Sequence, residues 1–330
     1  MNDKGVILSA LKNAANGFPA VLPNPMVGCV IVCNEEIVAE GYHQKFGEAH
    51  AEVNAINNLK AGVDPSECTL YVTLEPCTHF GKTPPCADLI IEKGFKKVVV
   101  CNHDPNPLVS GRGIEKLRKA GIEVITGVME EEGRALNKRF FTFHEKKRPY
   151  VILKWAQTAD GYISRLPVPE NREENIISTP DHQKMVHRMR SEEVAIMVGK
   201  NTVMHDNPKL TTRLVKGKNP VRIFIDQHLE VPLNFNIYNK EAETIVFNGK
   251  KNEIVDNIKF LQIDFNGHVL KHILDKLYQM NIQSILVEGG SKLLNYFIED
   301  GIYDELSVFE NKELVFGKGI KAPSIKNKPH

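Results

Sequence analysis

Hydrophobic positions in the first half of the chain alternate between two kinds of pattern. Short apolar runs rich in β-branched residues predict strands, and runs with helical spacing lie between them. The predicted strands are Met26–Val32, Thr69–Leu74, Lys97–Cys101 and Ile122–Ile125, and the predicted helices are Ala49–Leu59, Pro85–Lys93, Gly113–Ala120 and Glu130–Phe140. This rhythm is typical of an α/β domain in which helices pack on a largely buried sheet.

The second half repeats the rhythm after a charged stretch. Residues 145–148, followed by Pro149, have the composition of an exposed link, so we predict two domains, 1–146 and 147–330. The predicted strands of the second domain are Tyr150–Ala156, Val194–Val198, Val221–Asp226, Thr244–Phe247, Ser284–Glu288 and Glu305–Phe309, and its helices are Pro180–Arg190, Gly267–Met280 and Ser291–Glu299. The polar, aperiodic stretch Arg165–Asn175 is predicted to be a loop.

Charge and length narrow the class of partner. The 42 basic and 41 acidic residues nearly cancel, so no basic excess for nucleic acid is present and a small-molecule substrate is favoured. No stretch approaches the roughly 20 apolar residues that span a bilayer, and residues 1–15 hold no long apolar run. We therefore predict a cytoplasmic protein with neither a membrane nor a nucleic-acid partner.

The six cysteines all lie in the first third of the chain, at positions 29, 33, 68, 77, 86 and 101. In a cytosolic protein such clustering favours metal binding or core packing over disulfides. We predict that Cys29, Cys33 and Cys101 pack in or beside buried strands.

The clearest chemical signal is His50-Ala51-Glu52 followed by Pro76-Cys77 and then Cys86. One imidazole and two thiolates are ligands that zinc prefers, and three protein ligands leave a fourth position for water. Bound zinc lowers the pKa of that water to near neutrality, and Glu52, two residues after the histidine, can carry protons. The pattern is similar to the signature of zinc-dependent deaminases.

Two other interpretations of this cluster remain open. A closed structural zinc site could use Cys68 or His79 as a fourth ligand, although such a site has no use for Glu52. Alternatively, the histidine and both cysteines are unrelated core residues. The loop between the two cysteines is longer than the two residues usual in many deaminases, and it carries His79 and Lys82, which suit a phosphate or a pyrimidine.

At this point a family resemblance becomes specific. The stretch 73–86, with residues 23–29 upstream and 104–107 downstream, resembles the deaminase of the bifunctional riboflavin-biosynthesis deaminase/reductase family. The resemblance implies a cytidine-deaminase-like fold, with zinc held by His50, Cys77 and Cys86. It also implies substrate contacts from Asn24, His43, His79 and Lys82.

The second half carries no Gly-x-Gly-x-x-Gly, so a Rossmann domain is not indicated, and Gly111-Arg112-Gly113 is better interpreted as a helix start. Instead, Glu288-Gly289-Gly290-Ser291 ends a predicted strand in two glycines at a helix N-terminus. Glycines let the backbone approach a ligand, and the helix end offers N–H groups to a phosphate. Strand-to-helix turns also use two glycines for geometry alone.

Several motifs in order resemble the reductase of the same family: residues 154–161, 186–190, 199–203, 206–213, 288–290 and 304–306. The resemblance implies a dihydrofolate-reductase-like α/β domain that uses NADPH, and a homo-oligomer. The implied cofactor residues are Ala156, Thr202, Asp206, Gly289, Gly290 and Ser291, and the implied substrate residues are Lys154, Asp160, Ser178, Arg190, Leu210, Arg213 and Glu288.

The residue types suit these roles. Arg190, Arg213 and Lys154 can neutralise a phosphate, whereas Asp206 and Glu288 could bind ribosyl hydroxyls or cap helices. Two departures from the family pattern, Ala159 and Ile176, predict altered packing and an intact reaction. The expected activity is removal of the 2-amino group of a phosphoribosyl diaminopyrimidinone, then reduction of its ribosyl group.

Two rival functions remain to be weighed. A nucleic-acid deaminase with a binding module would show salt-sensitive binding to tRNA or single-stranded DNA, and the neutral charge speaks against it. A scaffold protein with two degenerate sites would not take up zinc, yet every zinc ligand and the acid/base are present.

Overall fold

The computed structural model describes residues 2–78, 84–107, 109–169 and 171–325. These residues form two compact units, 1–146 and 147–330. Within the described residues no helix combines the length and the apolar character needed to cross a membrane.

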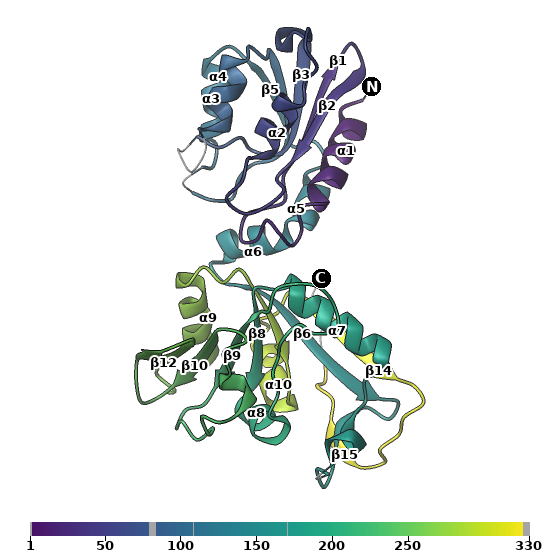
Figure 1. Cartoon of the computed structure of the whole chain (residues 1–330), viewed down its shortest axis with the longest axis vertical. Helices are drawn as coiled ribbons and strands as arrows, with labels where there is room; N and C mark the ends of the chain where they lie inside the picture. Colours follow the sequence, from purple (N-terminus) through teal and green to yellow (C-terminus); the bar gives the residue numbers. More distant parts are fainter. Residues whose placement is uncertain (1, 79–83, 108, 170, 326–330) are drawn as a thin grey trace. The chain divides into compact units, whose positions relative to one another are not determined.

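The first unit is built on one five-stranded sheet with the order β2-β1-β3-β4-β5 (Figure 1). Strand β1 runs antiparallel to β2 and β3, whereas β3, β4 and β5 are parallel. The strands are β1 (Gly28–Cys33), β2 (Glu36–Tyr42), β3 (Cys68–Leu74), β4 (Lys97–Asn102) and β5 (Glu123–Thr126). The helices are α1 (Asp3–Ala15), α2 (Ala51–Asn57), α3 (Cys86–Glu92), α4 (Arg112–Lys119), α5 (Glu130–Leu136) and α6 (Lys138–Lys146).

Helices cover both faces of this sheet because its strands alternate two apolar sets. Cys29 and Ile31 pack with α2, α3 and α4, whereas Val30 and Val32, one residue along, pack with α1. The predicted start of α4 is confirmed: Gly111 precedes it with a φ of 76°. The predicted helix 130–140 is two helices that meet at Asn137. There the buried amide of Asn137 binds the backbone N–H and carbonyl of Met26.

One prediction about the cysteines is wrong. Cys33 does not pack as a free thiol but forms a disulfide with Cys68, which also removes Cys68 as a zinc ligand. The cause is the antiparallel pairing of β1 with β3, which places these residues opposite each other with Cα atoms 4.4 Å apart. Cys29 and Cys101 are buried free thiols, as predicted.

Among its described residues, the second unit contains an eight-stranded sheet with the order β11-β12-β10-β9-β8-β13-β6-β14, in which only the β11–β12 pairing is antiparallel. Its strands are β6 (Tyr150–Thr158), β8 (Ala195–Gly199), β9 (Val221–Ile225), β10 (Thr244–Asn248), β11 (Glu253–Val255), β12 (Ile258–Gln262), β13 (Ser284–Glu288) and β14 (Glu305–Asn311). Strands β7 (Tyr162–Arg165) and β15 (Gly319–Lys321) form a separate pair.

Four helices accompany this sheet (Figure 1): α7 (Pro180–Glu192), α8 (Lys200–Asp206), α9 (Val269–Gln279) and α10 (Ser291–Glu299). Helices α9 and α10 bury apolar side chains such as Leu274 and Phe297 against one face. Short 3-10 turns occur at Pro65–Glu67, Arg172–Asn175 and Asn236–Tyr238. Parallel strands point the same way, so the carboxyl ends of β6, β8 and β13 meet at one edge, where the loops that follow them gather.

Candidate active sites

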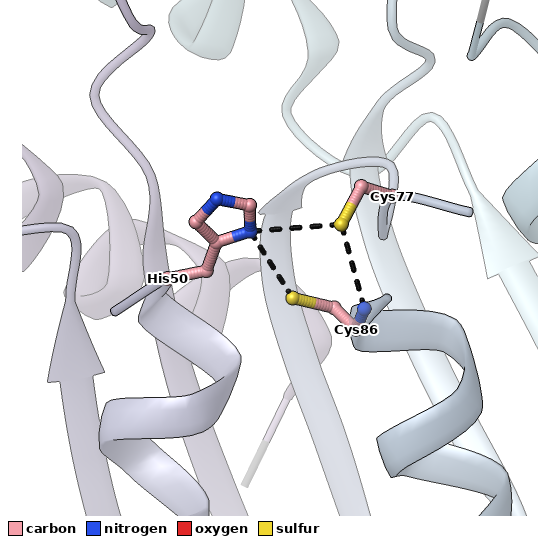
Figure 2. A group of neighbouring side chains, drawn as sticks. All are labelled: His50, Cys77 and Cys86. Carbon is pink, nitrogen blue, oxygen red and sulfur yellow. Dashed lines mark hydrogen bonds between the residues drawn. The ribbon is translucent and has the colours of Figure 1, made fainter. Parts of the chain in front are cut away.

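Three ligand-type side chains converge in the first unit (Figure 2). His50 immediately precedes α2, Cys86 is the first residue of α3, and Cys77 lies on the loop after β3. Nδ1 of His50 lies 3.3 Å from Sγ of Cys86 and 3.6 Å from Sγ of Cys77, and the three ligand atoms all lie within 4.8 Å of one another. Ligands on a tetrahedral zinc ion would be about 3.6 Å apart from nitrogen to sulfur, so this set fits zinc.

The two thiols differ in their surroundings. Cys77 lies where a thiolate is favoured, whereas the hydrogen bond with Cys77, and next burial, raise the pKa of Cys86. The backbone N–H of Cys86, at the start of α3, points to Sγ of Cys77 at 3.4 Å. The hydrogen bond with Cys86 holds the pKa of Cys77 well below its ordinary value. Because Cys86 is buried at the start of α3 and Cys77 is half-buried, the cluster is partly shielded from solvent.

Glu52 lies in the first turn of α2 and is 3% exposed. Burial, and next the nearby Cys77, raise the pKa of Glu52 to about 7. A carboxyl group with a pKa near neutrality exchanges protons readily, which is what general acid/base catalysis requires.

Two further residues singled out in the sequence, His43 and Asn24, are linked to His50 by contacts. The ring of His43 packs edge-on against that of His50, with centroids 5.6 Å apart. One ring nitrogen of His43 lies 3.2 Å from Nδ2 of Asn24, and the other lies 3.0 Å from the carbonyl oxygen of Ala49. The fold therefore brings Asn24 and His43 to the metal cluster, whereas His79 and Lys82 lie outside the described residues.

The second unit contains a cavity of about 1170 Å³ at the carboxyl edge of its sheet. Every cofactor residue inferred above lines it: Ala156, Thr202, Asp206, Gly289, Gly290 and Ser291. Five of the seven inferred substrate residues also line it: Lys154, Ser178, Arg190, Arg213 and Glu288. Ile176, one of the two departures from the family pattern, is 46% exposed and lines the same cavity.

Asp160 and Leu210 do not belong to that lining. The carboxylate of Asp160 accepts hydrogen bonds from the backbone N–H groups of Phe316 and Gly317, which fixes the segment after β14. Leu210 is 4% exposed and packs in the core beneath the sheet. Asp160 and Leu210 therefore hold neighbouring segments in place without facing the cavity.

Part of the cavity lining is charged. Arg190 on α7 donates two hydrogen bonds to Glu288, at 3.1 Å and 2.9 Å. Burial works to raise the pKa of Glu288, but Arg190 and Lys154 together hold it below its ordinary value. Burial lowers the pKa of Lys154. Three charges of mixed sign thus face the same space as Arg213.

The residues directly after Glu288 form a glycine-rich turn at the start of a helix. Gly289 adopts a φ of 127°, and a Cβ atom there would lie 3.0 Å from Oγ1 of Thr202. That hydroxyl accepts a hydrogen bond from the N–H of Gly290 at 3.2 Å, and α10 begins at the next residue. Backbone N–H groups at the start of a nine-residue helix therefore border the cavity.

Sequence reasoning missed one residue of this site. His187 on α7 lines the cavity and is 6% exposed, yet it lies inside a motif in which only Arg190 was assigned a role. The ring of His187 binds backbone N–H groups. Almost any residue type can supply such a group, so the sequence alone does not reveal these partners.

Fold and ligand set together define a zinc-binding deaminase domain and a reductase domain in one chain. Residues 1–102 match the cytidine and deoxycytidylate deaminase zinc-binding region, and residues 149–317 match the RibD C-terminal domain. The chain belongs to the RibD family of bifunctional riboflavin biosynthesis enzymes. It therefore comprises a zinc-binding hydrolase domain and a reductase domain of the RibD kind, which uses NADPH.

Three relatives illustrate the similarity. Riboflavin biosynthesis protein RibD of Aquifex aeolicus is 46% identical over 323 residues, which covers 96% of this chain and 89% of that protein. The crystal structure of a diaminohydroxyphosphoribosylaminopyrimidine deaminase/5-amino-6-(5-phosphoribosylamino)uracil reductase from Thermotoga maritima is 40% identical, with a TM-score of 0.86, and covers 99% of this chain and 93% of that one. RibD from Acinetobacter baumannii is 32% identical, with a TM-score of 0.86 and coverages of 99% and 91%.

Proposed function

We propose that this chain converts 2,5-diamino-6-ribosylamino-4(3H)-pyrimidinone 5′-phosphate in two steps. The first domain, residues 1–146, removes the 2-amino group. The second, residues 147–330, reduces the ribosyl side chain to ribityl with NADPH. The observation that carries the proposal is the convergence of His50, Cys77 and Cys86 around one point with the buried Glu52. The Thermotoga maritima relative is named for the same pair of reactions.

In the deaminase domain, the roles follow from position. Zinc held by the three ligands would supply a Lewis acid that lowers the pKa of water to near neutrality. Glu52 would take the proton from the attacking water and pass it to the departing ammonia. His43, which packs against His50, and Asn24, which contacts His43, would hold the pyrimidine. His79 and Lys82 remain proposed substrate contacts on the strength of the family motif alone.

In the reductase domain, the charged residues of the cavity suit the substrate. The guanidinium of Arg190 is neutralised by its two-bond pair with Glu288, whereas that of Arg213 donates to a neutral hydroxyl. We therefore assign the substrate phosphate first to Arg213, with Lys154 adding positive charge. Glu288 and Ser178 would bind the ribosyl hydroxyls. Asp160 and Leu210 would act by supporting the segments that border the substrate.

The glycine-rich turn after Glu288 suits the cofactor. NADPH would supply the hydride, and Gly289, Gly290 and Ser291 would bind its phosphates through backbone N–H groups. Thr202 and Asp206 on α8 and Ala156 on β6 would complete its site. The chain's own task is to hold the cofactor against the opened sugar.

The test is a product mass spectrum after purified protein is incubated with the diaminopyrimidinone ribosyl phosphate and NADPH. Exchange of one amino group for oxygen together with two added hydrogens is expected. The Glu52→Gln variant should retain zinc, release no ammonia and still reduce the deaminated pyrimidine. The matched control is Glu67→Gln, an exposed glutamate of the same unit. Unchanged substrate from a zinc-loaded wild type, or normal ammonia release by Glu52→Gln, would refute the proposal.

We also propose a cytoplasmic homo-oligomer. The phosphorylated substrate and NADPH are both held in the cytoplasm, and the edge strand β14 exposes Val308 (41% exposed), as interfaces between copies often do. Light scattering on the purified protein tests the oligomer, and a monomer at all concentrations would refute it.

The cytoplasmic location has its own test, because disulfides are rare in the cytoplasm. Thiol counting on protein denatured directly from cells therefore tests the location: six free thiols would support the cytoplasm, and four, with the Cys33–Cys68 bond intact, would contradict it.

A further inference from the structure

His187 is a buried histidine in the reductase cavity to which the proposed function gives no role. It lies on α7, three residues before Arg190, and its side chain borders the same space as Arg213 and Glu288. Histidines in such a position commonly bind a ligand or carry a proton. The contacts of this one indicate a different task.

The ring of His187 holds the backbone of a loop. Nδ1 accepts a hydrogen bond from the N–H of Arg213 at 2.8 Å, and the N–H of Leu214 points to the same atom at 3.5 Å. These residues lie between α8 and β9, outside any helix or strand. No repeating backbone ladder therefore fixes them, and the histidine provides the missing acceptor.

The side chain of Arg213 is fixed from the other direction. Its guanidinium donates to Oγ1 of Thr211 at 2.9 Å, and Thr211 is 1% exposed. Arg213 is thus held at its backbone by His187 and at its guanidinium by a buried threonine. Losing either contact would weaken the constraint on this long side chain, which could then sample more rotamers.

The charge state of His187 agrees with this arrangement. Burial, and then the neighbouring charges of Arg190 and Arg213, lower its pKa to about 4, and Glu288 acts weakly in the opposite sense. At neutral pH the ring is uncharged, so Nδ1 can accept and the other ring nitrogen carries the proton. A neutral ring also leaves the arginines without a third cation that would repel them.

We propose that His187 is a positioning residue for substrate binding: by accepting the N–H groups of Arg213 and Leu214, it places the Arg213 guanidinium where the substrate phosphate is bound. This inference rests on the proposed function, in which Arg213 receives that phosphate. It predicts that His187 contributes to affinity for phosphorylated substrate and contributes little to hydride transfer.

The experiment compares variants of the full chain in the reductase assay, using 5-amino-6-ribosylamino-uracil with and without its 5′-phosphate. His187→Leu and His187→Met remove the acceptor, whereas His187→Asn places an amide oxygen where Nδ1 was. Loss of the acceptor should raise KM for the phosphorylated compound about tenfold, the equivalent of one well-formed hydrogen bond. The value of kcat and the KM of the unphosphorylated compound should stay within about twofold, a change too small to represent a hydrogen bond, and His187→Asn should resemble the wild type.

A double variant separates positioning from general packing. If His187 acts through Arg213, then His187→Leu combined with Arg213→Gln should be no weaker than Arg213→Gln alone. Additive losses, or equal losses with both compounds, would overturn the inference. If Arg213→Gln itself does not alter the preference for the phosphate, the proposed function fails at that residue, and the two failures are thereby distinguished.

Two controls keep the result interpretable. Trp155, the chain's single tryptophan, reports folding of the second unit, and ammonia release reports the first. Should neither acceptor-free variant fold, the ¹⁵N spectrum of histidine in the wild-type protein decides. It should show His187 neutral at pH 7 with its proton on Nε2, and a proton on Nδ1 would overturn the inference.

Discussion

Glu75, two residues before a zinc ligand, offers the sharpest test of how the deaminase site is held. Its side chain is fully buried. One carboxylate oxygen accepts from the N–H groups of Gly113 at 2.8 Å and Ile114 at 3.3 Å. The other accepts from Gly111 at 2.9 Å and Asp104 at 3.3 Å. The residue thus joins the zinc-binding loop to the start of α4.

The contacts set the magnitude of the Glu75→Ala change. A hydrogen bond to a charged group is worth about 1.5–3 kcal/mol, so the two short bonds together predict a loss of about 3–6 kcal/mol in unfolding free energy. Four N–H groups, three of them on buried residues, would also lose their acceptor, and water would recover part of that cost. The loss is a large share of the about 5–15 kcal/mol that stabilises an ordinary domain.

The assay is urea unfolding of the zinc-loaded protein, followed by circular dichroism and by fluorescence of Trp155, which belongs to the second unit. Glu75→Ala should shift the transition of the first unit and leave that of Trp155 in place. The matched control is Glu115→Ala on α4, whose ion pair with Lys119 is exposed and contributes little to stability. If Glu75→Ala costs no more than the control, the reasoning from buried acceptors is wrong.

Three further outcomes are expected. Replacing Cys77 by serine, or removing zinc with a chelator, should abolish ammonia release while NADPH oxidation with the deaminated pyrimidine persists; joint loss of both would contradict separate sites. Gly289→Ala should raise KM for NADPH about tenfold. The φ of 127° at this position and the 3.0 Å approach of a Cβ atom to Thr202 strain any side chain, at a cost of about 1–3 kcal/mol. An unchanged KM in steady-state kinetics would argue against cofactor contact at Gly289. The folded pKa of His187, about 4, lies below its ordinary value of 6.5, so the unfolded chain takes up the proton first. The stability of the second unit should therefore be fullest above pH 6.5 and fall as the pH drops towards 4, and Trp155 fluorescence in urea should show no such slope for His187→Asn.

The zinc site could be predicted from the sequence because its chemistry is carried by residue types at fixed spacing. His50 and Cys86 each begin a short helix, and Cys77 follows a buried strand, so local patterns already placed all three at ends of elements. The glycines at 289 and 290 were interpretable for the same reason, since a strand leads directly into a helix there.

The elements that the sequence did not reveal have weak or distant signals. Strand β2 follows a turn at Asn34 and Glu35, both with positive φ and neither a glycine, so the usual mark of a hairpin is absent. The disulfide joins cysteines 35 positions apart, and only the register of β1 on β3 makes them neighbours. Register is a property of the assembled sheet, which periodicity along one segment does not specify.

Glu75 and His187 illustrate a deeper reason for such gaps. Each receives backbone N–H groups, from residues 104–114 in one case and from Arg213 and Leu214 in the other. Every residue except proline supplies that donor, so the partner leaves no trace in residue type. The residue type of such a donor is restricted only where its backbone lies very close to another segment: a Cβ atom at Gly113 would lie 2.1 Å from the carbonyl oxygen of Pro76. A motif therefore reveals the residues that act on the substrate, whereas those that place them are found only from the folded backbone.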